Sequence, residues 1–202
     1  MQNGRTVHIV NDDATARRSL VDVLGEAGFG ATTYDSADAL LAVAPELFGG
    51  CALVQVRMPA MDGFAIQSQL HDMKIHLPVV IIAAQGDVAT AVRAMKAGAV
   101  DVVETPYSHE ALVSTIETAF ERNGQLQRQR EAEEAATLIA RLSPREHEVL
   151  QALTAGRSNK AIAFDLGLSV RTVEVHRARM MERLGVKRLA EAVRLAVLSK
   201  FA

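Results

Sequence analysis

Short apolar runs alternate with amphipathic segments along the first 120 residues of the chain. A short apolar run indicates a buried strand, and apolar residues that recur every three to four positions indicate a helix. The expected strands are residues 7–10, 31–34, 52–56, 79–83 and 100–103. The expected helices are residues 14–27, 36–44, 64–73, 87–97 and a fifth that begins near Ser108 and runs past Phe120. Five strands alternating with five helices predict an α/β doubly wound domain with a parallel sheet.

A purely helical pattern follows residue 140. The four expected helices cover residues 144–156, 161–166, 170–184 and 189–198. The first has strong start signals, because Ser143 suits the N-cap, Pro144 the first helical position, and Glu146 the closing position of a capping box. A turn at Gly167 joins the second and third helices, which predicts a helix-turn-helix within an all-α, four-helix domain.

A polar segment separates the two patterned regions. Residues 123–139 are rich in Gln, Glu and Arg and poor in large apolar residues. The apolar positions of the preceding helix do not continue through this segment as a heptad, so we do not expect a long coiled coil. We interpret it as a partly helical linker between a domain at residues 1–122 and a domain at residues 140–202.

Charge divides the chain at the same place. Residues 140–202 hold 12 Lys and Arg against 6 Asp and Glu, whereas residues 1–139 hold 10 against 18. A basic module beside an acidic one favours a nucleic-acid partner for the basic module.

No stretch approaches the roughly 20 apolar residues of a membrane span. The polar N-terminus has no apolar run behind it. We therefore expect a cytoplasmic protein without a membrane partner.

Few residues offer reactive chemistry. The one cysteine, Cys51, excludes an internal disulfide and a thiolate zinc site. A lone cysteine is more often a small buried apolar residue than a redox switch. The sequence contains no nucleophile–base arrangement and no phosphate-cradling glycine loop, so we expect no enzyme, no cofactor and no resident metal.

The most informative positions are the ends of the predicted strands. In doubly wound domains the functional crevice lies at the carboxyl ends of the strands. Asp12 with Asp13, Gln55, Ala83 and Thr105 fall there. We therefore expect these residues to line one edge of the sheet.

Residues 5–122 resemble the receiver domain of bacterial response regulators. The matching residues are Met58-Pro59, Gly63, Ala94-Met95-Lys96-Ala97-Gly98-Ala99 and Thr105-Pro106-Tyr107. The resemblance implies a flavodoxin-like sheet with the strand order 2-1-3-4-5. In that family an aspartate at the end of the third strand takes a phosphoryl group. An acidic pair holds Mg²⁺ beside it, and a hydroxyl residue and a lysine complete the site.

Most of these family positions have lost their chemistry in this chain. The resemblance places the acidic pair at Asn11 and Asp12, the acceptor at Gln55, the hydroxyl at Ala83 and the lysine at Thr105. An amide oxygen is a poor nucleophile and brings no charge to a metal ion, so we expect a degenerate receiver that does not use aspartyl phosphate. Asp12 has two interpretations: it caps the first helix, or it belongs to a weak metal site or polar network.

Residues 140–200 resemble the LuxR/FixJ class of DNA-binding domains. The matching strings are Leu142-Ser143-Pro144-Arg145-Glu146, Gly156-Arg157-Ser158-Asn159-Lys160-Ala161-Ile162-Ala163 and Leu168-Ser169-Val170-Arg171-Thr172-Val173-Glu174-Val175-His176. Together the two halves of the chain resemble a FixJ-type two-domain transcriptional regulator. This resemblance implies a dimer that binds two half-sites on double-stranded DNA.

The third helix of this domain separates into two faces. The predicted inward face carries Val173, Met180 and Leu184. The residues predicted to enter the major groove are Arg171, Glu174, Val175 and Ala178. Arginine can donate to guanine, glutamate can accept from cytosine, and valine can contact the methyl group of thymine. The predicted phosphate contacts are Asn159, Lys160, Thr172, Arg179, Lys187 and Arg188.

The sequence thus predicts a DNA-binding transcriptional regulator that acts without aspartyl phosphorylation. Its receiver would serve dimerisation, with Tyr107 on the edge where receivers pair, or would dock a sensor protein or another regulator. One alternative is an interaction protein that pairs with and modulates an intact response regulator or sensor. A second is phosphorylation at a different acceptor, Asp13 or Asp62.

Overall fold

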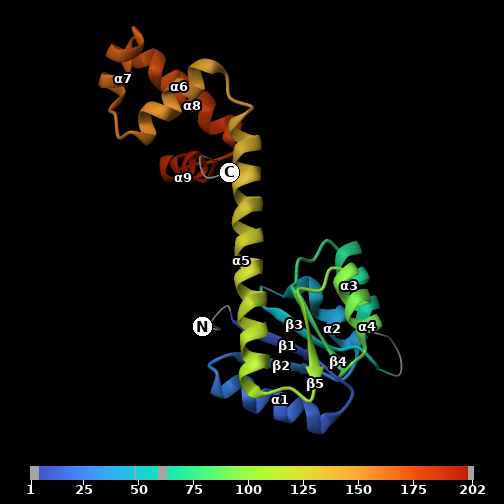
Figure 1. The fold of residues 1–202 in the computed structure, drawn as a ribbon. Coiled ribbons are helices and arrows are strands. Elements are labelled where there is room, and N and C mark those ends of the chain that lie inside the picture. The colour runs from blue at the N-terminus through green and yellow to red at the C-terminus, as the bar shows by residue number, and fades with distance from the viewer. Residues whose placement is uncertain (1–4, 48, 59–62, 200–202) are drawn as a thin grey trace. The chain divides into compact units, whose positions relative to one another are not determined.

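A sheet of five parallel strands forms the centre of the N-terminal part of the chain (Figure 1). The structure, a computed structural model, describes residues 5–47, 49–58 and 63–199. The strands are β1 Thr6–Val10, β2 Gly30–Tyr34, β3 Cys51–Gln55, β4 Val79–Ala84 and β5 Asp101–Thr105. Their order is β2-β1-β3-β4-β5 and each neighbouring pair is parallel. The predicted doubly wound fold and its strand order are confirmed.

The inner strands are apolar because helices cover both faces of the sheet. Nearly every residue of β1, β3 and β4 is buried, as expected for a parallel sheet between two helical layers. The helices are α1 Ala14–Glu26, α2 Ala37–Val43, the short 3₁₀ helix η1 Ala44–Glu46, α3 Gly63–Asp72, α4 Val88–Lys96 and α5 His109–Ile139. Leu24 of α1 and Ile116 of α5 pack on one face, and Leu40 of α2 and Ile66 of α3 pack on the other.

Four further helices form the C-terminal fold, and their starts follow the predicted signals. They are α6 Pro144–Thr154, α7 Asn159–Leu166, α8 Val170–Leu184 and α9 Leu189–Ser199. The hydroxyls of Ser143, Ser158 and Ser169 each accept a hydrogen bond from the backbone N–H three residues later. Gly167 ends α7 with a φ of 66°, a left-handed conformation that glycine adopts without strain. The predicted helix-turn-helix is therefore formed by α7 and α8.

Helix α5 has 31 residues and continues through the segment that the sequence marks as a linker. The chain divides into two compact units, Met1–Gly124 and Gln125–Ala202, so the boundary lies within this helix. Beyond the boundary Ala132 and Ala135 are buried, and Leu138 packs against the core of the C-terminal unit. None of the helices among the described residues is long and apolar enough to cross a membrane.

Candidate crevice and nucleic-acid interface

The parallel register brings the predicted crevice residues to one edge of the sheet. Val10 pairs with Val54, which places Asn11 beside Gln55 at the ends of β1 and β3. Ala84 pairs with Thr105 at the ends of β4 and β5. The five positions at which the resemblance places the family's phosphorylation site therefore lie along the carboxyl edge.

Asp13, and not Asp12, caps helix α1. The Asp13 carboxylate accepts hydrogen bonds from the backbone N–H groups of Thr15, at 2.7 Å, and Ala16, at 3.3 Å. The expectation that Asp12 caps the helix is wrong by one residue, because the cap must lie directly before the first helical residue, Ala14. Asp12 is exposed to solvent at the preceding bend.

The residues at this edge do not fit the Mg²⁺ ion that the receiver resemblance implies. Asn11 directs its side-chain oxygen to the backbone N–H of Asp13, at 2.8 Å. The guanidinium of Arg17 donates to the Asn11 carbonyl at 2.6 Å, which places a positive charge beside the edge. A hard divalent cation needs several oxygen ligands with negative charge, whereas Gln55 is neutral and the Asp13 carboxylate is engaged in the helix cap. Among the described residues at the five family positions, only Asp12 offers a carboxylate, and one carboxylate holds Mg²⁺ weakly.

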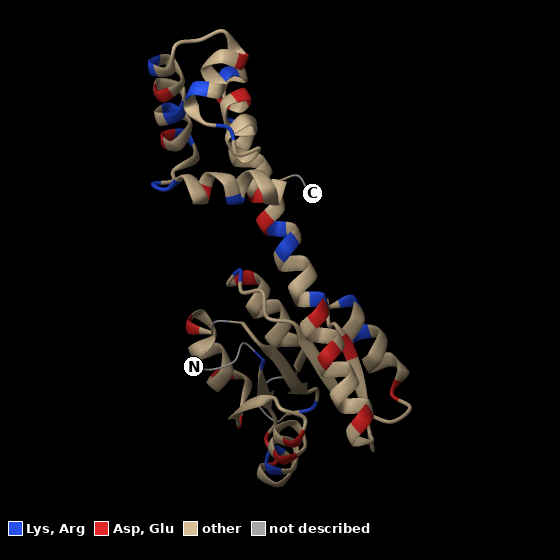
Figure 2. Ribbon diagram, turned by 90° about the vertical axis from the view of Figure 1, so that its left-hand side faces the viewer, with Lys and Arg blue, Asp and Glu red and all other residues tan. Residues whose placement is uncertain are grey.

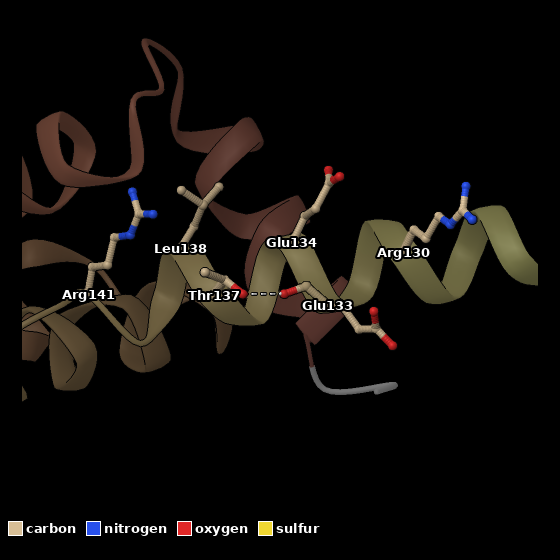
Figure 3. A pocket seen from close by; sticks show the side chains of 6 residues that line it. All are labelled: Arg130, Glu133, Glu134, Thr137, Leu138 and Arg141. Atoms are coloured by element: carbon tan, nitrogen blue, oxygen red, sulfur yellow. Dashed lines mark hydrogen bonds between the residues drawn. The ribbon is translucent and has the colours of Figure 1, made fainter. Parts of the chain in front are cut away.

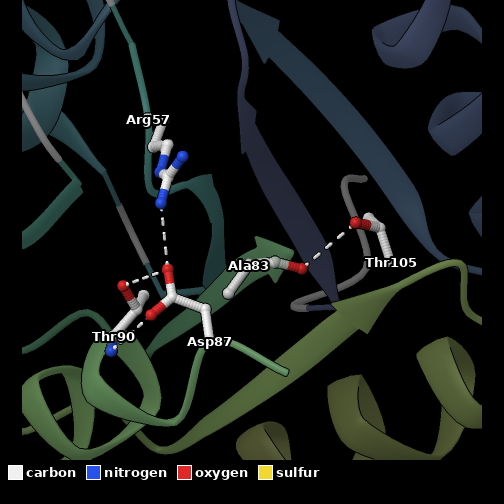
Figure 4. Close-up of polar contacts among 5 residues, drawn as sticks. All are labelled: Arg57, Ala83, Asp87, Thr90 and Thr105. Carbon is white, nitrogen blue, oxygen red and sulfur yellow. Dashed lines mark hydrogen bonds and ion pairs between the residues drawn. The ribbon is translucent and has the colours of Figure 1, made fainter. Parts of the chain in front are cut away.

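Ala83 and Thr105, on the other side of Gln55, are joined by a hydrogen bond. Ala83 is buried and has no hydroxyl group. The Thr105 hydroxyl donates to the Ala83 carbonyl at 3.2 Å (Figure 4). The side chain at the family's lysine position thus joins β5 to β4 and carries no charge for a phosphoryl oxygen.

An ion pair that the sequence did not suggest spans the same edge. The Arg57 guanidinium lies 3.1 Å from the Asp87 carboxylate (Figure 4). Asp87 is the N-cap of α4 and also accepts from the hydroxyl of Thr90, at 2.7 Å, and from its backbone N–H, at 3.0 Å. The hydrogen bonds from Thr90, followed by the charge of Arg57, hold the pKa of Asp87 below its ordinary value. Thirty positions separate the two charged residues, so periodicity alone could not pair them.

In the C-terminal unit, α8 has the two faces that the sequence predicted. Val173, Met180 and Leu184 are buried in the core of the unit, which confirms the inward face. The residues predicted to read bases are all exposed: Arg171, Glu174, Val175 and Ala178. The four side chains therefore form a solvent-exposed face of α8.

Several of the predicted phosphate contacts already have partners within the unit. Lys160, Arg179 and Lys187 are exposed, and Figure 2 shows how Lys and Arg are interspersed with Asp and Glu here. The Asn159 side chain accepts from Arg177 at 3.3 Å, and the Thr172 hydroxyl lies 2.8 Å from that of Ser169. Arg188 pairs with Glu191 at 2.7 Å, and this hydrogen bond is the main reason that the pKa of Glu191 is lowered.

Other candidate groups have structural roles. Cys51 is fully buried, and burial raises the pKa of its thiol to about 12, which agrees with a small apolar residue and not with a redox switch. Tyr107 packs against the core of the sheet, and burial raises the pKa of its phenol.

A shallow groove along α5 is lined by Arg130, Glu133, Glu134, Thr137, Leu138 and Arg141 (Figure 3). These side chains spread along one helix and do not converge on a common point.

Comparisons with known proteins agree with both halves of this architecture. Residues 7–117 match the response regulator receiver domain, and residues 140–196 match the bacterial regulatory proteins of the luxR family. The transcriptional regulatory protein FixJ of Rhizobium meliloti is 42% identical over 97% of this chain and 97% of that protein. FixJ of Bradyrhizobium diazoefficiens is 40% identical over 95% of this chain and 94% of that protein.

Solved structures give the same result. The crystal structure of full-length FixJ from B. japonicum is similar with a TM-score of 0.60 and 39% identity, over 98% of both chains. The response regulator StyR is similar with a TM-score of 0.66 and 38% identity, over 96% of this chain and 98% of that one. The chain therefore belongs to the FixJ-type two-domain response regulators, and it is a transcriptional regulator with a receiver domain and a LuxR-type DNA-binding domain.

Proposed function

We propose that this regulator binds specific DNA sites without aspartyl phosphorylation. The observation that carries the proposal is Gln55 at the end of β3, where the receiver family has its acceptor aspartate. The neighbouring positions support it, because Asn11 and Thr105 direct their side chains to nearby backbone groups and Ala83 has no polar group. A phosphoryl group at this edge would find an amide at the acceptor position, Gln55, and no lysine at position 105 to stabilise its charge.

The alternative acceptors receive little support. The Asp13 carboxylate accepts two backbone hydrogen bonds as the N-cap of α1, and phosphorylation would disrupt that cap. Asp62 lies outside the residues that the structure describes.

The receiver would serve as a constitutive dimerisation module, and helix α4 is its best candidate surface. Val88, Val92 and Met95 recur at spacings of four and three residues, so they form one stripe along the helix. Their exposed fractions are 67%, 48% and 47%. Apolar side chains grouped in this way indicate a protein contact more strongly than scattered ones do. A second copy of this chain would bury both stripes at once, as expected for a two-fold dimer.

The DNA-binding unit would read bases through the open face of α8. Arg171 would donate to guanine, Glu174 would accept from cytosine, and Val175 with Ala178 would contact thymine methyl groups. Six residues would contact phosphates: Asn159, Lys160, Thr172, Arg179, Lys187 and Arg188. Arg188 would have to release Glu191 before it could do so.

The test is a DNA titration of full-length protein before and after incubation with a small phosphodonor and Mg²⁺. The DNA site comes from in vitro selection with the untreated protein. We expect the same dissociation constant in both states, and an intact mass that gains no phosphoryl group. A control variant restores the family residues through Asn11→Asp, Gln55→Asp, Ala83→Thr and Thr105→Lys, and it should gain mass under the same conditions.

Two results would contradict the proposal. One is a phosphoryl group on the natural protein that tightens DNA binding. The other is the absence of any selected DNA site, together with heterodimers when the protein is mixed with an intact response regulator. The second result would favour the interaction protein that modulates another regulator.

A further inference from the structure

The Arg57–Asp87 ion pair connects two segments that are far apart in the sequence. Arg57 lies two residues after Gln55, the last residue of β3, and Asp87 is the N-cap of helix α4. Their side chains meet at 3.1 Å across the carboxyl edge of the sheet (Figure 4). The pair therefore links the loop after β3 to the start of the helix that carries the exposed apolar stripe.

Asp87 connects the ion pair directly to α4, because it is the N-cap of that helix. Its side chain is 21% exposed, and its carboxylate holds the first turn of the helix through two hydrogen bonds from Thr90. Val88, the first residue of the stripe, follows it directly. A contact that fixes Asp87 thus also fixes the end of the helix from which the stripe begins.

We propose that the Arg57–Asp87 pair is an ionic latch that favours one arrangement of the loop between β4 and α4, and of the first turn of α4, without a phosphoryl group. This inference rests on the proposed function, since a receiver without a phosphoryl group needs another contact to set the position of α4. Ala83 provides no side-chain hydrogen bond at the end of β4, whereas Arg57 reaches the helix itself. The latch would keep the apolar stripe in place for dimerisation without any input.

The strength of the latch is limited by solvent. The Arg57 side chain is 78% exposed, and an exposed ion pair contributes only a small local stabilisation that salt screens further. The latch would therefore bias local opening of the loop and leave the global stability of the receiver nearly unchanged. Backbone amide exchange is the measurement that reports such local opening.

The experiment follows hydrogen–deuterium exchange of residues 84–92 in the full-length protein without a phosphodonor. Arg57→Ala and Asp87→Asn each remove the ion pair, and Asn keeps the N-cap because it caps helices nearly as well as Asp. We expect exchange of this segment to accelerate about two- to fivefold in each variant, with no further increase in the double variant. Raising the salt concentration should accelerate it in the natural protein and have little effect in the variants.

The control variant is Arg145→Ala, which removes a 2.8 Å ion pair with Glu148 in the other unit and should leave residues 84–92 unchanged. Unchanged exchange of this segment in both Arg57→Ala and Asp87→Asn would overturn the latch. So would effects of the two substitutions that simply add in the double variant. The exchange experiment contains no phosphodonor, so it tests the latch and not phosphorylation. A negative exchange result would contradict the latch alone. Phosphorylation of the natural protein would contradict the proposed function alone.

Discussion

The polar side chains at the carboxyl edge of the sheet bond to the backbone around them. Asn11 accepts from the Asp13 N–H, and Thr105 donates to the Ala83 carbonyl. The sequence shows which residue types occupy these positions, and that is enough to predict the loss of phosphoryl chemistry. Their partners depend on loop geometry that residue types do not specify. For the same reason the sequence offered Asp12 as one candidate for the helix cap that Asp13 forms, and it could not pair Arg57 with Asp87.

Arg171 is the residue through which base recognition can be tested. It is exposed at the start of α8, where the recognition helix of a helix-turn-helix enters the major groove. Arg171→Ala should therefore lose about 1–3 kcal/mol of discrimination between the selected site and a scrambled site. Competition titrations with the two DNA duplexes measure this difference.

Lys160→Ala is the matched control for Arg171→Ala. Lys160 is also an exposed cation of the helix-turn-helix, but we predict that it contacts phosphate. Its removal should weaken binding to both duplexes equally and reduce the salt slope by about one. If Arg171→Ala behaved in this way too, the assignment of Arg171 to base reading would be wrong.

For the helices, the capping residues in the sequence predicted where a helix begins better than where it ends. Ser143 caps its helix as expected, because a cap is a short-range interaction between residues close in sequence, and Ser158 and Ser169 cap theirs in the same way. Helix α5 is longer than predicted, since its outer parts are stabilised by packing: Ile116 on the sheet, and Ala135 in the C-terminal unit. The polar segment between the two packed ends shows no apolar period, so the sequence indicated a partly helical linker there and not one continuous helix.

Glu146 joins α6 to the recognition helix and should make the C-terminal unit sensitive to acid. Its buried carboxylate closes the capping box on the Ser143 N–H, at 2.9 Å, and lies 3.4 Å from Arg183 of α8. Burial raises its pKa, but the hydrogen bonds with Ser143 and the charges of Arg183 and His176 outweigh that effect, so the pKa is lowered. The charged form therefore stabilises the folded state. This stabilisation is complete above the ordinary pKa of 4.5 and is lost as pH falls through the lowered value.

Glu146→Gln should destabilise the C-terminal unit by about 1–2 kcal/mol at neutral pH, because the amide cannot pair with Arg183 and caps less strongly. Denaturant titrations of the full-length variant and the natural protein measure this difference at several pH values. We expect the difference to shrink as pH falls from 4.5 through the lowered pKa of Glu146, because the natural carboxylate is protonated first in the unfolded state and then in the folded state. A difference that stays constant from neutral pH down to pH 3 would show that the charge of Glu146 is not the stabilising feature.

Across the full chain, the sequence predicted two domains and both folds, with the first domain at residues 1–122 and a linker at residues 123–139. The charge asymmetry and the change of hydrophobic period near residue 140 both reflect local composition. The division between the two compact units reflects packing and lies after Gly124, inside α5. The last residue of the first unit, Gly124, is a poor helix former. A Cβ at this position would meet nothing within 4 Å, so packing does not require a glycine at the boundary.

This division predicts which part of the chain folds as an independent DNA-binding unit. Residues 125–202 retain Leu138 and Ile139, which pack against the core of α6–α9, whereas residues 140–202 lack both. Each partly buried aliphatic side chain contributes about 1 kcal/mol, so the longer fragment should unfold at a temperature about 10 °C higher. Thermal unfolding followed by circular dichroism measures this shift. Within the longer fragment, Leu138→Ala should lower the midpoint, and Leu126→Ala, at a 55% exposed position of the same helix, should not. Equal midpoints for the two fragments would mean that the end of α5 is a linker and not part of the DNA-binding unit.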